Sequence, residues 1–88
     1  MNTIWKFIFD IQDEFRFDLD IEAKVLHVED QFGRPCMWVL LDPDAPRKMR
    51  EFKIRGTGQD FDAQGWAHVG TFQQAQGSLV WHLFEEVR

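Results

Sequence analysis

The sequence predicts an all-β protein, a single small antiparallel sandwich or partly open barrel of about seven strands. Apolar and polar side chains alternate with a period of two in several segments, as they do in half-buried strands. Turn signals containing Gly, Pro or Asp recur roughly every 8–12 residues, and no segment has the periodicity of a convincing amphipathic helix. With 88 residues the chain has room for one core, so residues 1–88 form one domain.

The first two strands are expected at residues 3–11 and 14–22. Aromatic residues at positions 5, 7 and 9 share one side of the first segment. In the second segment Phe15, Phe17 and Leu19 face inward between charged residues that face outward. One wet face is typical of a strand in an antiparallel sheet. Gln12-Asp13 between the two segments is expected to form a tight turn.

The third and fourth strands are expected to form a hairpin from about residue 24 to residue 42. Residues 24–30 form its first arm, and Phe32 to Pro35 form the turn. Six apolar residues from Cys36 to Leu41 are too few for an ordinary helix, and they predict a strand that is buried on both faces. The prolines at positions 43 and 46 cannot donate to a ladder, so the strand ends there.

Three more strands are expected at residues 49–55, 66–72 and 78–87. Gly70 interrupts the second of them and indicates a β-bulge. The last one is apolar on both faces, and for that reason we expect it beside residues 36–41. A short helix near residues 44–50 or 58–66 is an open alternative.

The composition favours an aromatic core and excludes several classes of protein. Nine Phe and four Trp can bury a large apolar area in a short chain. Cys36 is the single cysteine, which excludes an intramolecular disulfide and a Cys-based zinc site within one chain. The start of the chain does not resemble a signal peptide, and no apolar run approaches 18 residues. We therefore expect a cytoplasmic protein that does not enter a membrane.

The charge is unevenly distributed along the chain. The net charge of −5 argues against binding to the phosphate backbone of nucleic acids. Residues 1–46 hold 10 acidic and 4 basic side chains, whereas residues 47–88 hold 5 acidic and 6 basic ones. Opposed charges of this kind favour electrostatic steering toward a partner.

The basic segment from residue 47 to 55 is the first candidate site. Guanidinium groups hold phosphate oxygens bidentately, and the Gly56-Thr-Gly58 turn that follows lets backbone N–H groups approach an anion. A tryptophan beside them could stack on a base. The candidate residues for a phosphate or an acidic partner are Arg47, Arg50, Lys53, Arg55, Thr57 and Trp66. A solvated strand edge that discourages aggregation has the same composition.

An acidic row on the second strand is the other candidate. Its members are Glu14, Asp18, Asp20 and Glu22, which could together meet a basic partner or imitate a nucleic-acid backbone. A solvent-exposed strand face that only keeps a small protein soluble would carry the same row of acidic residues.

No catalytic constellation is evident. There is no Gly-x-Ser-x-Gly, no pair of carboxylates stands out, and Cys36 has no basic neighbour in the sequence. His27, His68 and His82 lie on different expected strands without the spacing of a zinc-binding helix. We therefore expect no catalytic residues, no metal site and no cofactor, and the protein is not expected to be an enzyme.

Motifs along nearly the whole chain resemble a family of small uncharacterised proteins from tailed phages and prophages. They are Thr3-Ile-Trp-Lys-Phe7, Ala23-Lys-Val-Leu26, Gly33-Arg-Pro-Cys-Met-Trp-Val-Leu-Leu-Asp-Pro43, Ile54-Arg-Gly-Thr-Gly58, Gly70-Thr-Phe72 and Leu79-Val-Trp-His-Leu-Phe84. Members of that family often carry a proline or glycine before the Ala-Lys-Val segment, where this chain has Ile21-Glu22. The resemblance implies no activity and no site residues.

Small phage accessory proteins of this kind tend to act by stoichiometric binding. The leading expectation is a non-enzymatic phage protein that inhibits a host protein, such as a defence component, in the host cytoplasm. The alternative is a homo-oligomer that sequesters a phosphorylated nucleotide signal, since so short a chain has little room for a pocket of its own. A structural accessory protein is the third hypothesis.

Overall fold

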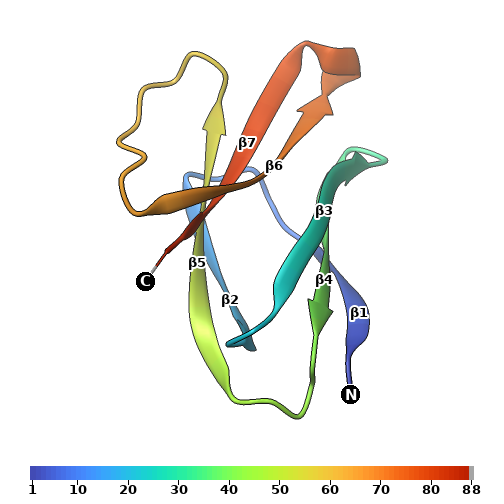
Figure 1. The fold of residues 1–88 in the computed structure, drawn as a ribbon. Coiled ribbons are helices and arrows are strands. Elements are labelled where there is room, and N and C mark those ends of the chain that lie inside the picture. The colour runs from blue at the N-terminus through green and yellow to red at the C-terminus, as the bar shows by residue number, and fades with distance from the viewer. Residues whose placement is uncertain (88) are drawn as a thin grey trace.

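The computed structural model describes residues 1–87 and contains seven strands, as the sequence predicted (Figure 1). Their bounds are β1 Thr3–Ile8, β2 Glu14–Asp20, β3 Lys24–Gln31, β4 Arg34–Leu41, β5 Arg47–Gly56, β6 Trp66–Gln74 and β7 Leu79–Glu86. A single turn of 3-10 helix, Ala75–Gly77, precedes β7. Neither of the short helices left open from the sequence forms within residues 1–87, because 44–50 enters β5 and 58–66 is a loop that enters β6.

The strands form two antiparallel sheets that do not close into a barrel. The three-stranded sheet has the order β1-β4-β3, and the four-stranded sheet has the order β2-β5-β7-β6. The predicted hairpin is present: β3 pairs with β4 through a two-residue turn, Phe32-Gly33, in which both residues have positive φ. This is the turn type that matches the twist of a hairpin, and the glycine adopts its part of it without strain.

Two expectations about strand neighbours were wrong. The last strand, β7, does not lie beside β4 but between β5 and β6 in the other sheet. Both β4 and β7 are central strands of their sheets. Apolar residues on both faces indicate that a strand is central, but they do not indicate which sheet it belongs to. The segment at Gln12-Asp13 is likewise not a hairpin turn, since β1 and β2 belong to different sheets and the chain crosses between them.

Phenylalanine rings fill the space between the sheets. Phe9 stacks on Phe15 with ring centroids 4.9 Å apart, and Phe15 stacks on Phe52 at 5.3 Å. Phe72 meets Phe9 edge to face at 5.9 Å. Both arrangements are favourable for aromatic rings, so these contacts join the chain before β2 to three strands of the four-stranded sheet.

The sheets meet along one edge, where β3 lies against β6. The bulge predicted near Gly70 is present between His68 and Gly70, and a second one lies between Val25 and His27. A Cβ at Gly70 would lie 3.1 Å from Val28 Cγ2, so glycine permits this close approach. Asp30 Oδ2 accepts a hydrogen bond from Gln74 Nε2 at 2.7 Å across the same edge.

Candidate functional site

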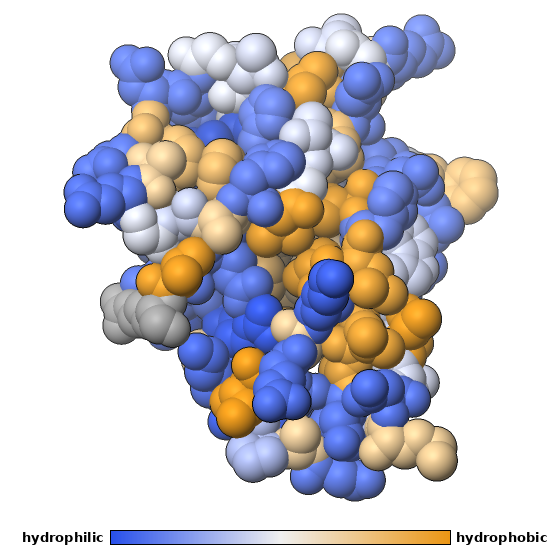
Figure 2. Space-filling view, in the orientation of Figure 1, coloured by the Kyte–Doolittle hydropathy of each residue, from blue (hydrophilic) through white to orange (hydrophobic). Residues whose placement is uncertain are grey.

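The outer face of the three-stranded sheet is largely apolar. Register places Ile4, Lys6 and Ile8 of β1 on this face together with Trp38 and Leu40 of β4. We call the four apolar residues among them the apolar sheet face; Ile4 and Ile8 are exposed, and Trp38 and Leu40 are half-buried. Leu26, in the β3 bulge beside it, is also exposed. Figure 2 shows apolar surface gathered over β3 and β4 and continuing toward β1.

Polar and charged groups lie within and beside the apolar sheet face, with Lys6 directly opposite Trp38 in register. Lys6 Nζ donates to Gln31 Oε1 at 3.0 Å, so the lysine stem crosses β4. His27 lies with its ring centroid 5.6 Å from that of Trp38, and its Nε2 is 3.5 Å from a carboxylate oxygen of Glu29. An aromatic centre with a polar margin is the usual anatomy of a protein–protein interface.

The outer face of the four-stranded sheet carries a cluster of two histidines and two threonines. Thr71 Oγ1 lies 2.9 Å from His68 Nε2 and 3.0 Å from His82 Nδ1. Thr57 Oγ1 lies 2.8 Å from His82 Nε2. We call these four residues the imidazole cluster. One hydroxyl can donate to one ring and accept from the other, so the four side chains form a continuous hydrogen-bonded chain.

The β6 bulge creates the imidazole cluster. Regular alternation would put residues 68 and 71 on opposite faces of a strand. The extra residue, Val69, shifts the register so that His68 pairs with Phe84 while Thr71 pairs with His82 on the same face. Sequence reasoning missed this pair of histidines, although the bulge signal at Gly70 was visible.

Basic and aromatic side chains surround the imidazole cluster. Lys53 Nζ lies 4.4 Å from the centroid of the Trp66 ring, and the Arg55 guanidinium lies 5.2 Å from the Phe61 ring. Both are cation–π distances. Phe61 also contacts Phe84, with centroids 4.7 Å apart. The structure thus brings together four of the six residues predicted for an anion site: Lys53, Arg55, Thr57 and Trp66.

The other two predicted anion-binding residues lie elsewhere. Arg47 Nε is 3.6 Å from Asp18 Oδ2, and its Nη2 donates to the Asp18 carbonyl. Arg50 points to the opposite side of β5, where it forms an ion pair with Glu85 and donates to the carbonyls of Asp20 and Ala23. Its guanidinium is therefore occupied by partners within the chain.

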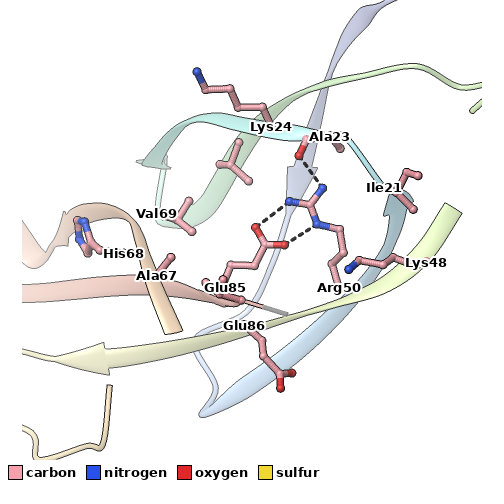
Figure 3. A pocket seen from close by; sticks show the side chains of 12 residues that line it. Ile21, Ala23, Lys24, Lys48, Arg50, Ala67, His68, Val69, Glu85 and Glu86 are labelled. Carbon is pink, nitrogen blue, oxygen red and sulfur yellow. Dashed lines mark hydrogen bonds and ion pairs between the residues drawn. The ribbon is translucent and has the colours of Figure 1, made fainter. Parts of the chain in front are cut away.

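Arg50 and Glu85 form the floor of a pocket of about 430 Å³ that is lined by residues of β3, β5, β6 and β7. Figure 3 shows the two side chains pointing toward each other, with the Ala23 carbonyl on the far side of the guanidinium. Lys24 and Lys48 stand at the margin. The volume falls in the range of ligand pockets, but the floor already satisfies its own charges, which is typical of a structural ion pair.

The acidic row does not form one surface. Glu14 and Asp18 face outward beside the basic strand β5, where Glu14 pairs in register with Lys53. Asp20 is buried, and its two carboxylate oxygens accept the backbone N–H groups of Glu22 and Asp42. Glu22 lies in the turn that follows. The acidic and basic segments are therefore neighbours, and much of the charge separation seen along the sequence is cancelled in space.

The four tryptophans lie on different surfaces. Trp5 is on the inner side of β1, and Trp38 is on the apolar sheet face. Trp66 is beside Lys53, while Trp81 Nε1 donates to Gln74 Oε1 at 3.0 Å and packs near Gly56. An aromatic pocket lined by all of them is not formed.

Within residues 1–87, no group of three His, Cys, Asp or Glu side chains has the geometry to hold a metal ion. Cys36 is buried, with its Sγ 3.3 Å from the Arg34 carbonyl.

The N–H of Asp44 donates to Asp42 Oδ1 at 3.0 Å and lowers the pKa of the Asp42 carboxyl below its ordinary value of 3.8. The terminal ammonium of Met1, 3.4 Å away, acts in the same direction.

In the described part of the chain no helix is long and apolar enough to cross a membrane. A search of curated proteins and a search of solved structures each gave no match. A family model described as a domain of unknown function, DUF7352, matches residues 1–88. The chain therefore belongs to the DUF7352 family, whose domain here is a two-sheet β sandwich.

Proposed function

We propose that this protein is a non-enzymatic binding protein of phage origin that inhibits a host protein by stoichiometric association. The observation that carries the proposal is the apolar sheet face, since exposed apolar side chains around an aromatic residue mark docking surfaces. The resemblance of the sequence motifs to those of phage proteins supports the phage origin, and the target we favour is a host defence component.

The scaffold suits this role. The apolar sheet face lies on two regular strands, β1 and β4, which pair without a break in register. A surface held by paired strands loses little conformational entropy when a partner binds. The charged groups of this surface, Lys6 opposite Trp38 and Glu29 on β3, would steer a partner of complementary charge and make the association rate depend on salt.

The test is a pull-down from bacterial host lysate with the wild-type protein and two double variants. Leu26→Lys with Trp38→Lys places charges at the apolar sheet face. Met49→Lys with Leu79→Lys is the matched control, because Leu79 is as exposed as Leu26 (46% against 45%) and lies in the other sheet. We expect one host protein to co-purify with the wild type and the control but not with the first variant. Equal capture by both variants, or no capture at low and moderate salt, contradicts the proposal.

A second candidate function is the sequestration of a phosphorylated nucleotide signal. The observation that favours it is the gathering of Lys53, Arg55 and Trp66 around the imidazole cluster. Cations and hydroxyls there could meet a phosphate, and Trp66 could stack on a base. A homo-oligomer would enlarge this shallow surface into a shared site.

A thermal-shift screen with cyclic dinucleotides and ADP-ribose derivatives distinguishes the two functions. A ligand at a hundredfold excess over its dissociation constant stabilises the folded state by about 2.7 kcal/mol. The shift should disappear in Trp66→Leu and persist in Trp38→Leu, which changes the opposite sheet. If none of these compounds raises the melting temperature, the protein does not sequester cyclic dinucleotides or ADP-ribose derivatives, and the second candidate function is contradicted.

A further inference from the structure

Strand β1 has a free edge. It pairs with β4 on one side only and lies at the outside of the three-stranded sheet (Figure 1). Four of its six residues are apolar, and Ile4, Trp5 and Ile8 are 54%, 41% and 43% exposed. It contains no proline, and its register with β4 has no bulge. An edge with these properties is a template for another strand.

The other three edges are protected. Strands β3 and β6 cover each other, and each contains a bulge. Strand β2 carries Glu14, Arg16 and Asp18 at alternate positions, which discourages pairing with another chain. Strand β1 carries one charge, Lys6, against three alternating charges on β2, so β1 is the least protected of the four edges.

We propose that β1 pairs antiparallel with β1 of a second copy, joining two three-stranded sheets into one sheet of six strands. This inference goes beyond the proposed function and does not require it. A second copy is the occupant we favour, because two copies can pair about a two-fold axis with each Lys6 opposite an isoleucine, so that no like charges meet. The resulting two-fold interface is closed and uses the same edge on both copies.

The charge on Lys6 selects the register. Continuity of the two sheet faces requires residues of the same face to lie opposite each other. Among the registers that meet this condition, two pair five of the six residues of β1, one with Trp5 opposite the partner's Trp5 and one with Lys6 opposite the partner's Lys6. The second places like charges directly opposite, which is unfavourable. The register centred on Trp5 places Lys6 opposite the partner's Ile4. It also brings the half-exposed Trp5 rings of the two copies into contact, and such aromatic pairs are favourable.

The experiment is light scattering coupled to size-exclusion chromatography over a concentration series, supported by circular dichroism. We expect the wild type to approach twice its 10.5 kDa mass as its concentration rises. Trp5→Lys places two charges at the two-fold axis and should raise the dissociation constant at least about tenfold. Met49→Lys is the control on the other sheet and should leave the dissociation constant unchanged.

A second variant tests the register and remains informative if Trp5→Lys does not fold. Ile4→Glu lies opposite the partner's Lys6 in the proposed register, so it should keep or tighten the dimer. In the register centred on Lys6 it lies opposite the partner's Ile8 and should weaken the dimer. A wild type that stays monomeric, a Trp5→Lys protein that folds and still forms the dimer, or an Ile4→Glu dimer that is weaker than the wild type each overturns the proposal.

Discussion

Arg50 and Glu85 form a bidentate ion pair in which Arg50 Nη2 lies 2.8 Å from Glu85 Oε1. The side chains are 11% and 17% exposed. The same guanidinium donates to the Ala23 carbonyl at 2.6 Å, so one side chain of β5 joins β7 to the turn between β2 and β3. The four-stranded sheet is thereby linked to the turn that enters β3 of the other sheet.

Removal of Arg50 should therefore destabilise the fold. Arg50→Ala leaves the largely buried carboxylate of Glu85 without its partner, and we expect a loss of about 3 kcal/mol in the free energy of unfolding. Lys48→Ala, an exposed position on the same strand, should change it by less than about 0.5 kcal/mol. Urea denaturation measures both. An Arg50→Ala protein as stable as Lys48→Ala would show that the ion pair contributes nothing net.

Asp20 should be equally important, although it looks like one more surface carboxylate in the sequence. It is 3% exposed, and its oxygens accept the N–H groups of Glu22 and Asp42. Because hydrogen bonds to a charged group are strong, Asp20→Ala should cost about 3 kcal/mol in urea denaturation. Asp18→Ala removes only an exposed ion pair with Arg47 and should cost less than about 1 kcal/mol. Equal costs would contradict the bridging role of Asp20.

The close approach of β6 to β3 predicts a coupling between two positions. The methyl group of Gly70→Ala would lie 3.1 Å from Val28 Cγ2, and this overpacking should cost about 1–3 kcal/mol. In a Val28→Ala background the space is free, so Gly70→Ala should cost much less there. A double-mutant cycle by thermal or urea denaturation gives the coupling energy. The same cost in both backgrounds would mean that the sheets do not meet at this point.

The lowered pKa of Asp42 predicts that the free energy of unfolding decreases slightly at acid pH. Its pKa lies below 3.8 in the folded protein, mainly because it accepts the N–H of Asp44. A carboxyl whose pKa is lowered by folding stabilises the fold above the pKa of the unfolded chain, and this stabilisation is lost as the pH falls through the lower, folded value. NMR titration of the Asp42 side chain should give a midpoint below 3.8, and Asp42→Asn should lose this part of the acid dependence. A midpoint at or above 3.8 contradicts the assignment.

The sequence predicted the strands well and their arrangement less well. Alternation located β2, and the hairpin from β3 to β4 followed from an apolar run bounded by turn residues. The pattern of apolar residues could not assign β7 to a sheet, because burial on both faces is common to every central strand. Pairings such as Thr3 with Leu41 join residues distant along the chain, and no local pattern encodes them.

The candidate site was predicted only in part. Lys53, Arg55 and Trp66 do share a surface, whereas Arg50 faces inward because it is an odd number of positions from both Lys53 and Arg55 on the same strand. The imidazole cluster escaped prediction since it depends on a single extra residue in β6. The burial of Asp20 depends on its place at a strand end, where unpaired N–H groups need an acceptor.

The position of β7 inside its sheet has a consequence for synthesis of the protein. During translation β5 and β6 emerge first, but neither pairs with the other, and the strand that joins them ends at Glu86. The four-stranded sheet therefore cannot assemble on a growing chain until β7 has been synthesised. Until β7 has emerged, the sheet is incomplete and the phenylalanines of β2 and β5 are not fully covered, which leaves them open to chaperones.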